Sequence, residues 1–146
     1  MTKLTVTIRT GTWTELKQAA QAIRLAVFVH EQHVPLEMEW DEWDELSLHV
    51  VALVGTEAVG TGRLLPDGHI GRMAVLKNWR GQHIGSAILR GLLQQASQHN
   101  QLMLHSQISA VPFYQKFGFV PTGKDFMEAG IAHVRMVRCR SLTEQD

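Results

Sequence analysis

One glycine-bearing segment, residues 72–89, combines residue types that suit the binding of a phosphate group. A β-prone run leads into a basic turn, and the turn opens a helical pattern. The first-turn amides of a helix lack internal partners and carry partial positive charge, and Arg80 adds a full charge. Gly81 and Gly85 let the backbone approach phosphate without an intervening Cβ. The amides that would converge on an anion are those of Gly81, Gln82, His83, Ile84, Gly85 and Ser86.

Taken alone, this segment equally fits an ordinary strand–helix connection with glycines at a tight turn. Its glycine spacing differs from the dinucleotide-binding fingerprint, and it has no Gly-Lys-Ser/Thr of a Walker turn. The phosphate-binding interpretation therefore needs support from elsewhere in the chain.

Charged residues gather in two further runs. Residues 37–45 hold six of the fourteen acidic residues, and a basic stretch follows with Arg72, Lys77, Arg80 and Arg90. Two solvated surfaces explain such runs as well as binding sites do. His30 and His33 have a spacing that suits one helical face, but no third ligand lies at a familiar spacing, so we predict no metal.

Periodicity predicts the elements that position these residues. We expect strands at residues 4–10, 48–54, 57–65, 69–76, 102–106, 119–126 and 132–138, and helices at 14–29, 84–99 and 109–117. Thr12 or Thr14 would cap the first helix, and residues 31–45 are irregular with room for a short second helix. This order predicts an α/β fold, a mixed sheet with helices on its faces.

Composition limits the classes of function. The 146 residues are 45% hydrophobic and show no linker or repeat, which predicts a single domain over residues 1–146. Fourteen basic residues balance fourteen acidic ones, which argues against nucleic-acid binding. The single cysteine, Cys139, cannot form an internal disulfide, and no stretch reads as a signal peptide or membrane span. We expect a cytoplasmic protein with no membrane partner.

Two sequence blocks resemble the GNAT superfamily of acetyltransferases. The family signature Gln/Arg-x-x-Gly-x-Gly/Ala, which holds the pyrophosphate of coenzyme A, matches residues 80–85, except that His83 stands where glycine is usual. A second block, Asn-x-x-Ala-x-x-x-Tyr-x-x-x-Gly-Phe, matches residues 107–119 with only Gln107 differing. The chain is most similar to a small bacterial subgroup that pairs an early Val-Phe-x-x-Glu-Gln segment with a late Gly-Ile-x-His-x-x-Met segment.

The resemblance implies a mostly antiparallel mixed sheet with a central splay. Backbone groups of Met73, Ala74 and Val75 would border that gap, pair with the pantetheine of acetyl-coenzyme A and polarise its thioester. Gln107, in the second block, would also contact the cofactor. The implied reaction is direct transfer of an acetyl group from acetyl-coenzyme A, a co-substrate, to a primary amine in a ternary complex.

Proton transfer in that reaction needs an acid and a base. Tyr114, the only tyrosine, would protonate the leaving thiolate, although it could merely pack. The candidate bases, of which we favour Glu128 and His133, are Glu31, His49, His105, Glu128 and His133. The acidic run 37–45 would attract a cationic acceptor, or it is solvated with Trp40 and Trp43 in the core.

The acceptor itself is not readable from the residues. A small molecule or a peptide amine fits equally, and a homodimer is compatible with the resemblance. The departures at His83 and Gln107 keep open an alternative function, a non-catalytic module that binds acyl-coenzyme A.

Overall fold

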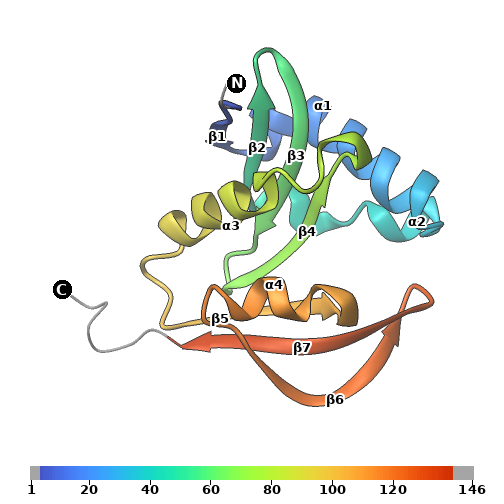
Figure 1. Ribbon diagram of the computed structural model, residues 1–146, viewed down its shortest axis with the longest axis vertical. Coiled ribbons are helices and arrows are strands. Elements are labelled where there is room, and N and C mark those ends of the chain that lie inside the picture. The colour runs from blue at the N-terminus through green and yellow to red at the C-terminus, as the bar shows by residue number, and fades with distance from the viewer. Residues whose placement is uncertain (1–3, 140–146) are drawn as a thin grey trace.

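The computed structural model describes residues 4–139, which form one seven-stranded sheet with helices on both faces (Figure 1). The sheet order is β1-β2-β3-β4-β5-β7-β6, and every neighbouring pair is antiparallel except β4 and β5. The strands are β1 (Thr7–Gly11), β2 (Leu48–Val54), β3 (Glu57–Leu64), β4 (His69–Val75), β5 (Gln101–Gln107), β6 (Val120–Glu128) and β7 (Ile131–Cys139).

The helices are α1 (Trp13–Arg24), continued by the π-helical segment η1 (Leu25–Glu31), then α2 (Leu36–Glu39), α3 (Ile84–Gln95) and α4 (Val111–Gln115). Short 3-10 turns are η2 (Glu42–Leu46), η3 (Lys77–Trp79) and η4 (Ile108–Ala110). Thr12 caps α1 and forms a capping box with Glu15. Within residues 4–139, no helix has the length and apolar character needed to cross a bilayer.

The sheet divides where β4 meets β5. These parallel strands pair only at His69–Met103 and Ile70–Leu104, and from there they diverge (Figure 1). Of the remaining residues of β4, Gly71, Ala74 and Val75 pair with β3 on one side, Arg72 and Met73 lie where that register shifts, and none has a β5 partner on the other side. The expected central splay and the mixed, mostly antiparallel sheet are confirmed.

Close packing fixes α3 against the sheet and therefore against the end of β4. Ile84, Ile88 and Leu92 of α3 are buried on β3, where Gly60 and Gly62 offer no side chain. A Cβ on Gly60 would lie 2.6 Å from Ile88 Cδ1, and a Cβ on Gly62 would lie 2.9 Å from Leu92 Cδ1. The two glycines thus let the helix lie directly on the sheet, which sets where its N-terminus points.

All three expected helices differ from the structure in form or length, and the one expected over 109–117 is a 3-10 turn, η4, followed by α4, which ends at Gln115. The first helix, expected over residues 14–29, leaves α-helical geometry after Arg24 and continues as a π helix to Glu31, with the Gln32 amide donating to the Val27 carbonyl. The helix expected over 84–99 ends at Gln95. Periodicity could not indicate the widened turn, because α and π turns bury the same kinds of residue and π turns depend on tertiary contacts.

Candidate active site

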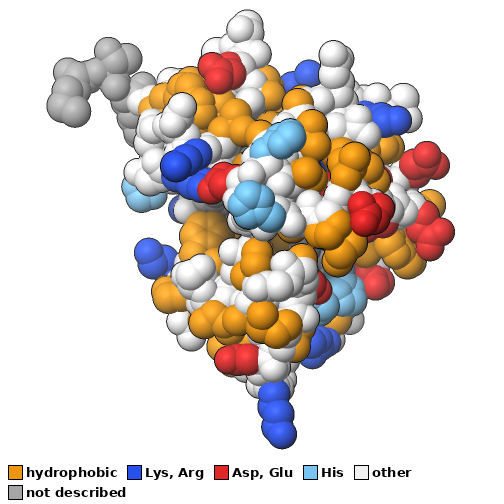
Figure 2. All heavy atoms as spheres, turned by 90° about the vertical axis from the view of Figure 1, so that its right-hand side faces the viewer, with side chains coloured by type: hydrophobic (Ala, Val, Ile, Leu, Met, Phe, Trp, Pro, Cys, Tyr) orange, Lys and Arg blue, Asp and Glu red, His pale blue; other side chains and the backbone are white. Residues whose placement is uncertain are grey.

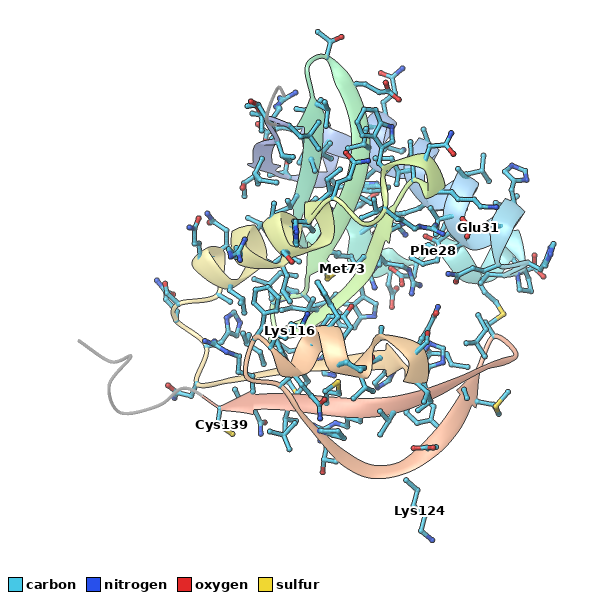
Figure 3. The ribbon with its side chains drawn as sticks, viewed as in Figure 1. Phe28, Glu31, Met73, Lys116, Lys124 and Cys139 are labelled. Carbon is cyan, nitrogen blue, oxygen red and sulfur yellow. The ribbon has the colours of Figure 1, made fainter. Side chains whose placement is uncertain are left out.

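A cavity of about 550 Å³ lies in the splay between β4 and β5. One wall comes from η1 and α2, a second from β4, and a third from β5, α4 and the β6–β7 hairpin. Figure 2 shows this side of the molecule hollowed between the upper and lower parts of the sheet. In Figure 3, Phe28 and Glu31 project from η1, and Met73 lies between β4 and α4. The volume suits a small-molecule site.

The exposed edge of β4 offers backbone groups to this cavity. The Leu76 amide donates to the Val59 carbonyl at 2.9 Å, so Leu76 and Val59 form a hydrogen-bonded pair between the two strands. Because such pairs alternate along an antiparallel ladder, Ala74 is turned toward Thr61 of β3, whereas Val75 is turned toward the splay. Met73 and Val75, two residues apart, therefore share the cavity side. The hydrogen-bonding groups of Ala74 are thus directed to β3, although Ala74 also lines the cavity.

The turn before α3 has the open backbone expected of an anion site. Gly81 has φ +80°, and a Cβ built on it would meet no atom within 4 Å. The first helical hydrogen bond runs from the Ala87 amide to the His83 carbonyl, so the preceding amides have no intrahelical acceptor. At Gly85 a side chain is less restricted, since a Cβ there would lie 3.6 Å from Phe113, an ordinary van der Waals distance. Gln82 is exposed, Ser86 is partly buried, and Ile84 is buried beneath the turn.

His83 occupies a left-handed backbone conformation. Its φ is +65°, where glycine is favoured and histidine is among the better-tolerated alternatives. Its side chain is exposed and makes no capping hydrogen bond. The departure from the family glycine is thus accommodated by the turn at some cost in backbone strain.

Arg80 does not present a free charge to the turn. Its two terminal nitrogens lie 2.6 and 2.7 Å from the carboxylate oxygens of Glu31, and its Nε donates to the Val75 carbonyl at 2.9 Å. The hydrogen bonds from Arg80 lower the pKa of Glu31, so this carboxylate is charged and engaged. We therefore correct two expectations. Arg80 is neutralised locally, and Glu31 is not an available base.

Gln107 lies at the far side of the splay and lines the cavity. Its side-chain Nε2 donates to the side-chain Oε1 of Gln32 at 3.1 Å, which joins the end of β5 to the end of η1. A contact from Gln107 to a bound cofactor would have to coexist with this hydrogen bond or replace it.

Tyr114 lines the same cavity from α4. Its hydroxyl donates to Met73 Sδ at 3.7 Å, and thioether sulfur is a weak acceptor. Burial raises the pKa of Tyr114 to about 12, so the phenol stays protonated at neutral pH. The side chain is thus held beside β4 with a proton that it can donate.

Three titratable side chains meet at the lower wall of the cavity. Glu128 lies between two histidines, with His105 Nδ1 at 3.1 Å from its Oε1 and His133 Nε2 at 3.7 Å from its Oε2. His133 Nδ1 lies 2.7 Å from the Ile131 carbonyl, which can only accept, so Nδ1 carries the proton. In neutral His133, Nε2 is therefore the basic nitrogen. The ring of Phe126 stacks on His133 and restrains it.

His49 is not part of this site. Its ring is buried against Trp13, and Nε2 lies 2.8 Å from the Asp44 carbonyl. Burial lowers the pKa of His49, so the ring is neutral and donates to that carbonyl. The structure gives it a packing role, and it does not line the cavity.

The acidic run 37–45 is only partly a solvated surface. Arg24 is buried and binds Glu39 and Asp44, while Arg63 binds Asp44 and Asp41. Although burial opposes it, hydrogen bonds from Arg24 and Arg63 hold the pKa of Asp44 below its usual value. Half of the run's carboxylates are thus neutralised internally, which reduces the expected attraction for a cation. Trp43 is exposed, contrary to the packed alternative, whereas Trp40 is partly buried.

The cavity wall includes residues that sequence reasoning did not name as site residues, among them Phe28, Gln32 and Arg72. Phe28 lies in the π-helical segment and Gln32 follows it, and this segment left no signal in the periodicity. Arg72 did leave a signal in the sequence. An arginine within a mainly apolar strand, next to the expected splay, is unusual enough to be examined as a site residue.

Comparisons with known proteins agree with this geometry. The family model described as "Acetyltransferase (GNAT) domain" matches residues 14–139. The N-acetyltransferase YjcF of Bacillus subtilis is 39% identical over 122 residues, which cover 80% of this chain and 87% of YjcF. The crystal structure of Escherichia coli ElaA superposes with a TM-score of 0.82 at 28% identity and covers 92% of this chain and 99% of ElaA.

A third relative carries a more specific description. An acyl-CoA N-acyltransferase from Pseudomonas aeruginosa superposes with a TM-score of 0.79 at 29% identity, covering 93% of this chain and 99% of that one. The family match spans both the turn of residues 80–86 and the block of residues 107–119. The chain therefore belongs to the GNAT family of acetyltransferases.

Proposed function

We propose that this chain is an N-acetyltransferase that moves an acetyl group from acetyl-coenzyme A to a primary amine by direct transfer in a ternary complex. The observation that carries the proposal is the separation of β4 from β5 beside the N-terminus of α3. A pyrophosphate at the turn of residues 81–86 would have its pantetheine arm directed along the free edge of β4. We expect the reaction to take place in the cytoplasm.

The donor carbonyl would lie beside the backbone of β4. An amide of the free edge, at Met73 or Val75, can donate to the oxygen that becomes negative when the amine attacks. The Val75 carbonyl already accepts from Arg80, so the contribution of Val75 is its amide. Backbone donors on a paired strand are rigid, and a rigid donor stabilises developing charge without reorganising.

The acceptor amine would approach from the wall formed by Glu128 and His133. A protonated primary amine has a pKa near 10, so a base must take its proton before the nitrogen can attack. His133 Nε2 is the unprotonated nitrogen of the neutral ring, and Glu128 stabilises the ring once it is charged. We assign His133 as the base and Glu128 as its partner.

From its position on α4, Tyr114 would complete the transfer. The amine nitrogen bonds to the carbonyl carbon, the carbon–sulfur bond breaks, and the departing thiolate takes the Tyr114 proton. The bonded nitrogen loses its second proton as it becomes the amide, and that proton restores the phenol directly or through water. The tyrosinate, whose conjugate acid has a pKa of about 12, is a far stronger base than a thiolate whose thiol has a pKa of about 8.5, so its reprotonation completes the step.

An acceptor screen tests the proposal. Purified protein is mixed with acetyl-coenzyme A and a panel of amines, and both free thiol and acetylated amine are measured, the latter by mass spectrometry. Cys139 is exposed and reacts with thiol reagents, so each reaction needs a matched sample without amine. Acetylated product with any amine supports the proposal. Saturable acetyl-coenzyme A binding with no product from a broad panel would favour the non-catalytic alternative.

A further inference from the structure

Arg72 has an unusual position in the wall of the cavity. It stands on β4 two residues beyond Ile70, the last residue that pairs with β5, where the register with β3 also shifts. Its φ is +50°, a conformation that a non-glycine residue adopts only when its surroundings hold it. Its guanidinium is part-buried and lines the cavity.

The hydrogen bonding of Arg72 is incomplete. One terminal nitrogen donates to Asp41 Oδ2 at 3.1 Å and reaches the Met38 carbonyl at 3.4 Å. Its Nε is buried, and no acceptor within residues 4–139 lies within hydrogen-bonding distance of it. The nearby Glu39 Oε1 is 3.7 Å away and is already bound by Arg24 Nε. A buried donor without a partner is costly. The other terminal nitrogen of Arg72 is not buried and makes no hydrogen bond within residues 4–139, so it is open to a ligand oxygen.

The opposite wall has the complementary chemistry. His133 of β7 is paired with Gln107 of β5, three residues beyond the last β4–β5 pair, and it lines the same cavity as Arg72. Glu128 lies between His133 and His105 on that wall. One cavity therefore has a guanidinium on one side and a carboxylate with two imidazoles on the other.

We propose that the acceptor is an amine that also carries a carboxylate, as in a free amino acid, and that Arg72 binds this carboxylate while the amine faces Glu128 and His133. The inference deepens the proposed function and rests on it. A guanidinium nitrogen donates a charge-assisted hydrogen bond to a carboxylate oxygen. The accessible terminal nitrogen of Arg72, which makes no hydrogen bond within residues 4–139, is such a donor.

A polyamine is the competing acceptor, because Glu39 lies in the same wall. Its carboxylate is bound by Arg24, and burial raises the pKa of Glu39, so it is poorly suited to hold a second cation. A second ammonium group would also lie beside the Arg72 guanidinium, which is paired with Asp41 through only one of its terminal nitrogens. The other terminal nitrogen is a donor, and it favours an acceptor oxygen at this point.

The test compares each amino acid with its own α-amide as the acceptor for the full-length protein. We expect the wild type to acetylate the free acid at least about tenfold better in kcat/KM than the amide. Arg72→Gln should lower kcat/KM for the acid by about 100-fold, as typically follows removal of one member of a buried charge pair, and lower it much less for the amide. Arg72→Lys keeps the charge but loses the planar guanidinium, so its kcat/KM for the acid should lie between those of the wild type and Arg72→Gln.

The ratio of acid to amide is measured on a single preparation, so a partly unfolded variant does not distort it. Equal rates for acid and amide in the wild type, or an equal loss of both in Arg72→Gln, would overturn the inference and leave the proposed function intact. If no amine is acetylated, the proposed function fails instead. Calorimetry of the same pairs with coenzyme A present then decides the inference: binding of the acid by wild type but not by Arg72→Gln supports it, and equal or absent binding overturns it.

Discussion

Arg80 donates hydrogen bonds from both terminal nitrogens to the carboxylate of Glu31, at 2.6 and 2.7 Å, although Glu31 lies 49 residues earlier in the chain. The Nε of Arg80 donates to the Val75 carbonyl at the same time. One side chain thus ties the π-helical segment η1 to the end of β4 and to the turn before α3. The arrangement also cancels a positive charge at the place where the pyrophosphate is proposed to bind.

Replacing Glu31 with Gln should make coenzyme A bind several-fold more tightly at low ionic strength. The change leaves the charge of Arg80 uncompensated beside the pyrophosphate, and salt should screen the gain. The free energy of unfolding should fall by less than about 1 kcal/mol, because the pair is largely exposed. Isothermal titration at two salt concentrations measures the effect. Weaker binding would instead mean that Glu31 is needed to hold Arg80 in position.

Gly81 and Gly55 offer a matched pair of substitutions. Both have positive φ, at +80° and +62°, and a Cβ on either would meet no atom within 4 Å. Alanine at each should therefore cost a similar amount of stability, about 1 kcal/mol, from backbone strain alone. Only Gly81→Ala should weaken coenzyme A binding, by about tenfold or more. Thermal melts and calorimetry measure both; equal affinities in the two variants would remove the turn from the donor site.

Local signals in the sequence predicted the strand–turn–helix unit around Gly81 well. A strand, a glycine turn and an amphipathic helix are each specified by neighbouring residues, and Gly60 and Gly62 then allow the helix to lie on the sheet. The splay followed from the resemblance, because no periodicity reports where two strands stop pairing.

Side-chain partners from distant segments were not predictable. The sequence of residues 37–45 is typical of a solvated surface, since nothing within it indicates that Arg24 and Arg63 form buried ion pairs with two of its carboxylates. Arg80 likewise reads as a free cation until Glu31 is placed beside it. Glu128 and His133 were expected to be close because one turn joins their strands, whereas His105 comes to Glu128 only through the placement of β5 beside β7.

His133→Gln should reduce kcat/KM by about 100-fold at pH 7, and the loss should shrink as the pH approaches the pKa of the acceptor amine, near 10. At that pH the amine loses its proton to water, so a base is no longer needed. His105→Gln is the matched control, because His105 touches Glu128 but its ring has no fixed tautomer from a backbone carbonyl. It should cost much less. A loss at His133 that stays constant across the pH range would indicate a structural role.

Tyr114→Phe should lower kcat by about 100-fold and leave the affinity for coenzyme A nearly unchanged. The substitution removes only the hydroxyl, whose partner is the weak acceptor Met73 Sδ, so packing against Phe113 and Phe119 is kept.

Because burial raises the pKa of Tyr114 to about 12, the phenol keeps its proton throughout the range below that value. The wild-type rate should therefore show no alkaline decline from tyrosine ionisation below about pH 10. Steady-state rates from pH 6 to about 10, with acetyl-coenzyme A affinity measured separately, test both expectations; an unchanged kcat in the phenylalanine variant would exclude Tyr114 as the proton donor to the thiolate.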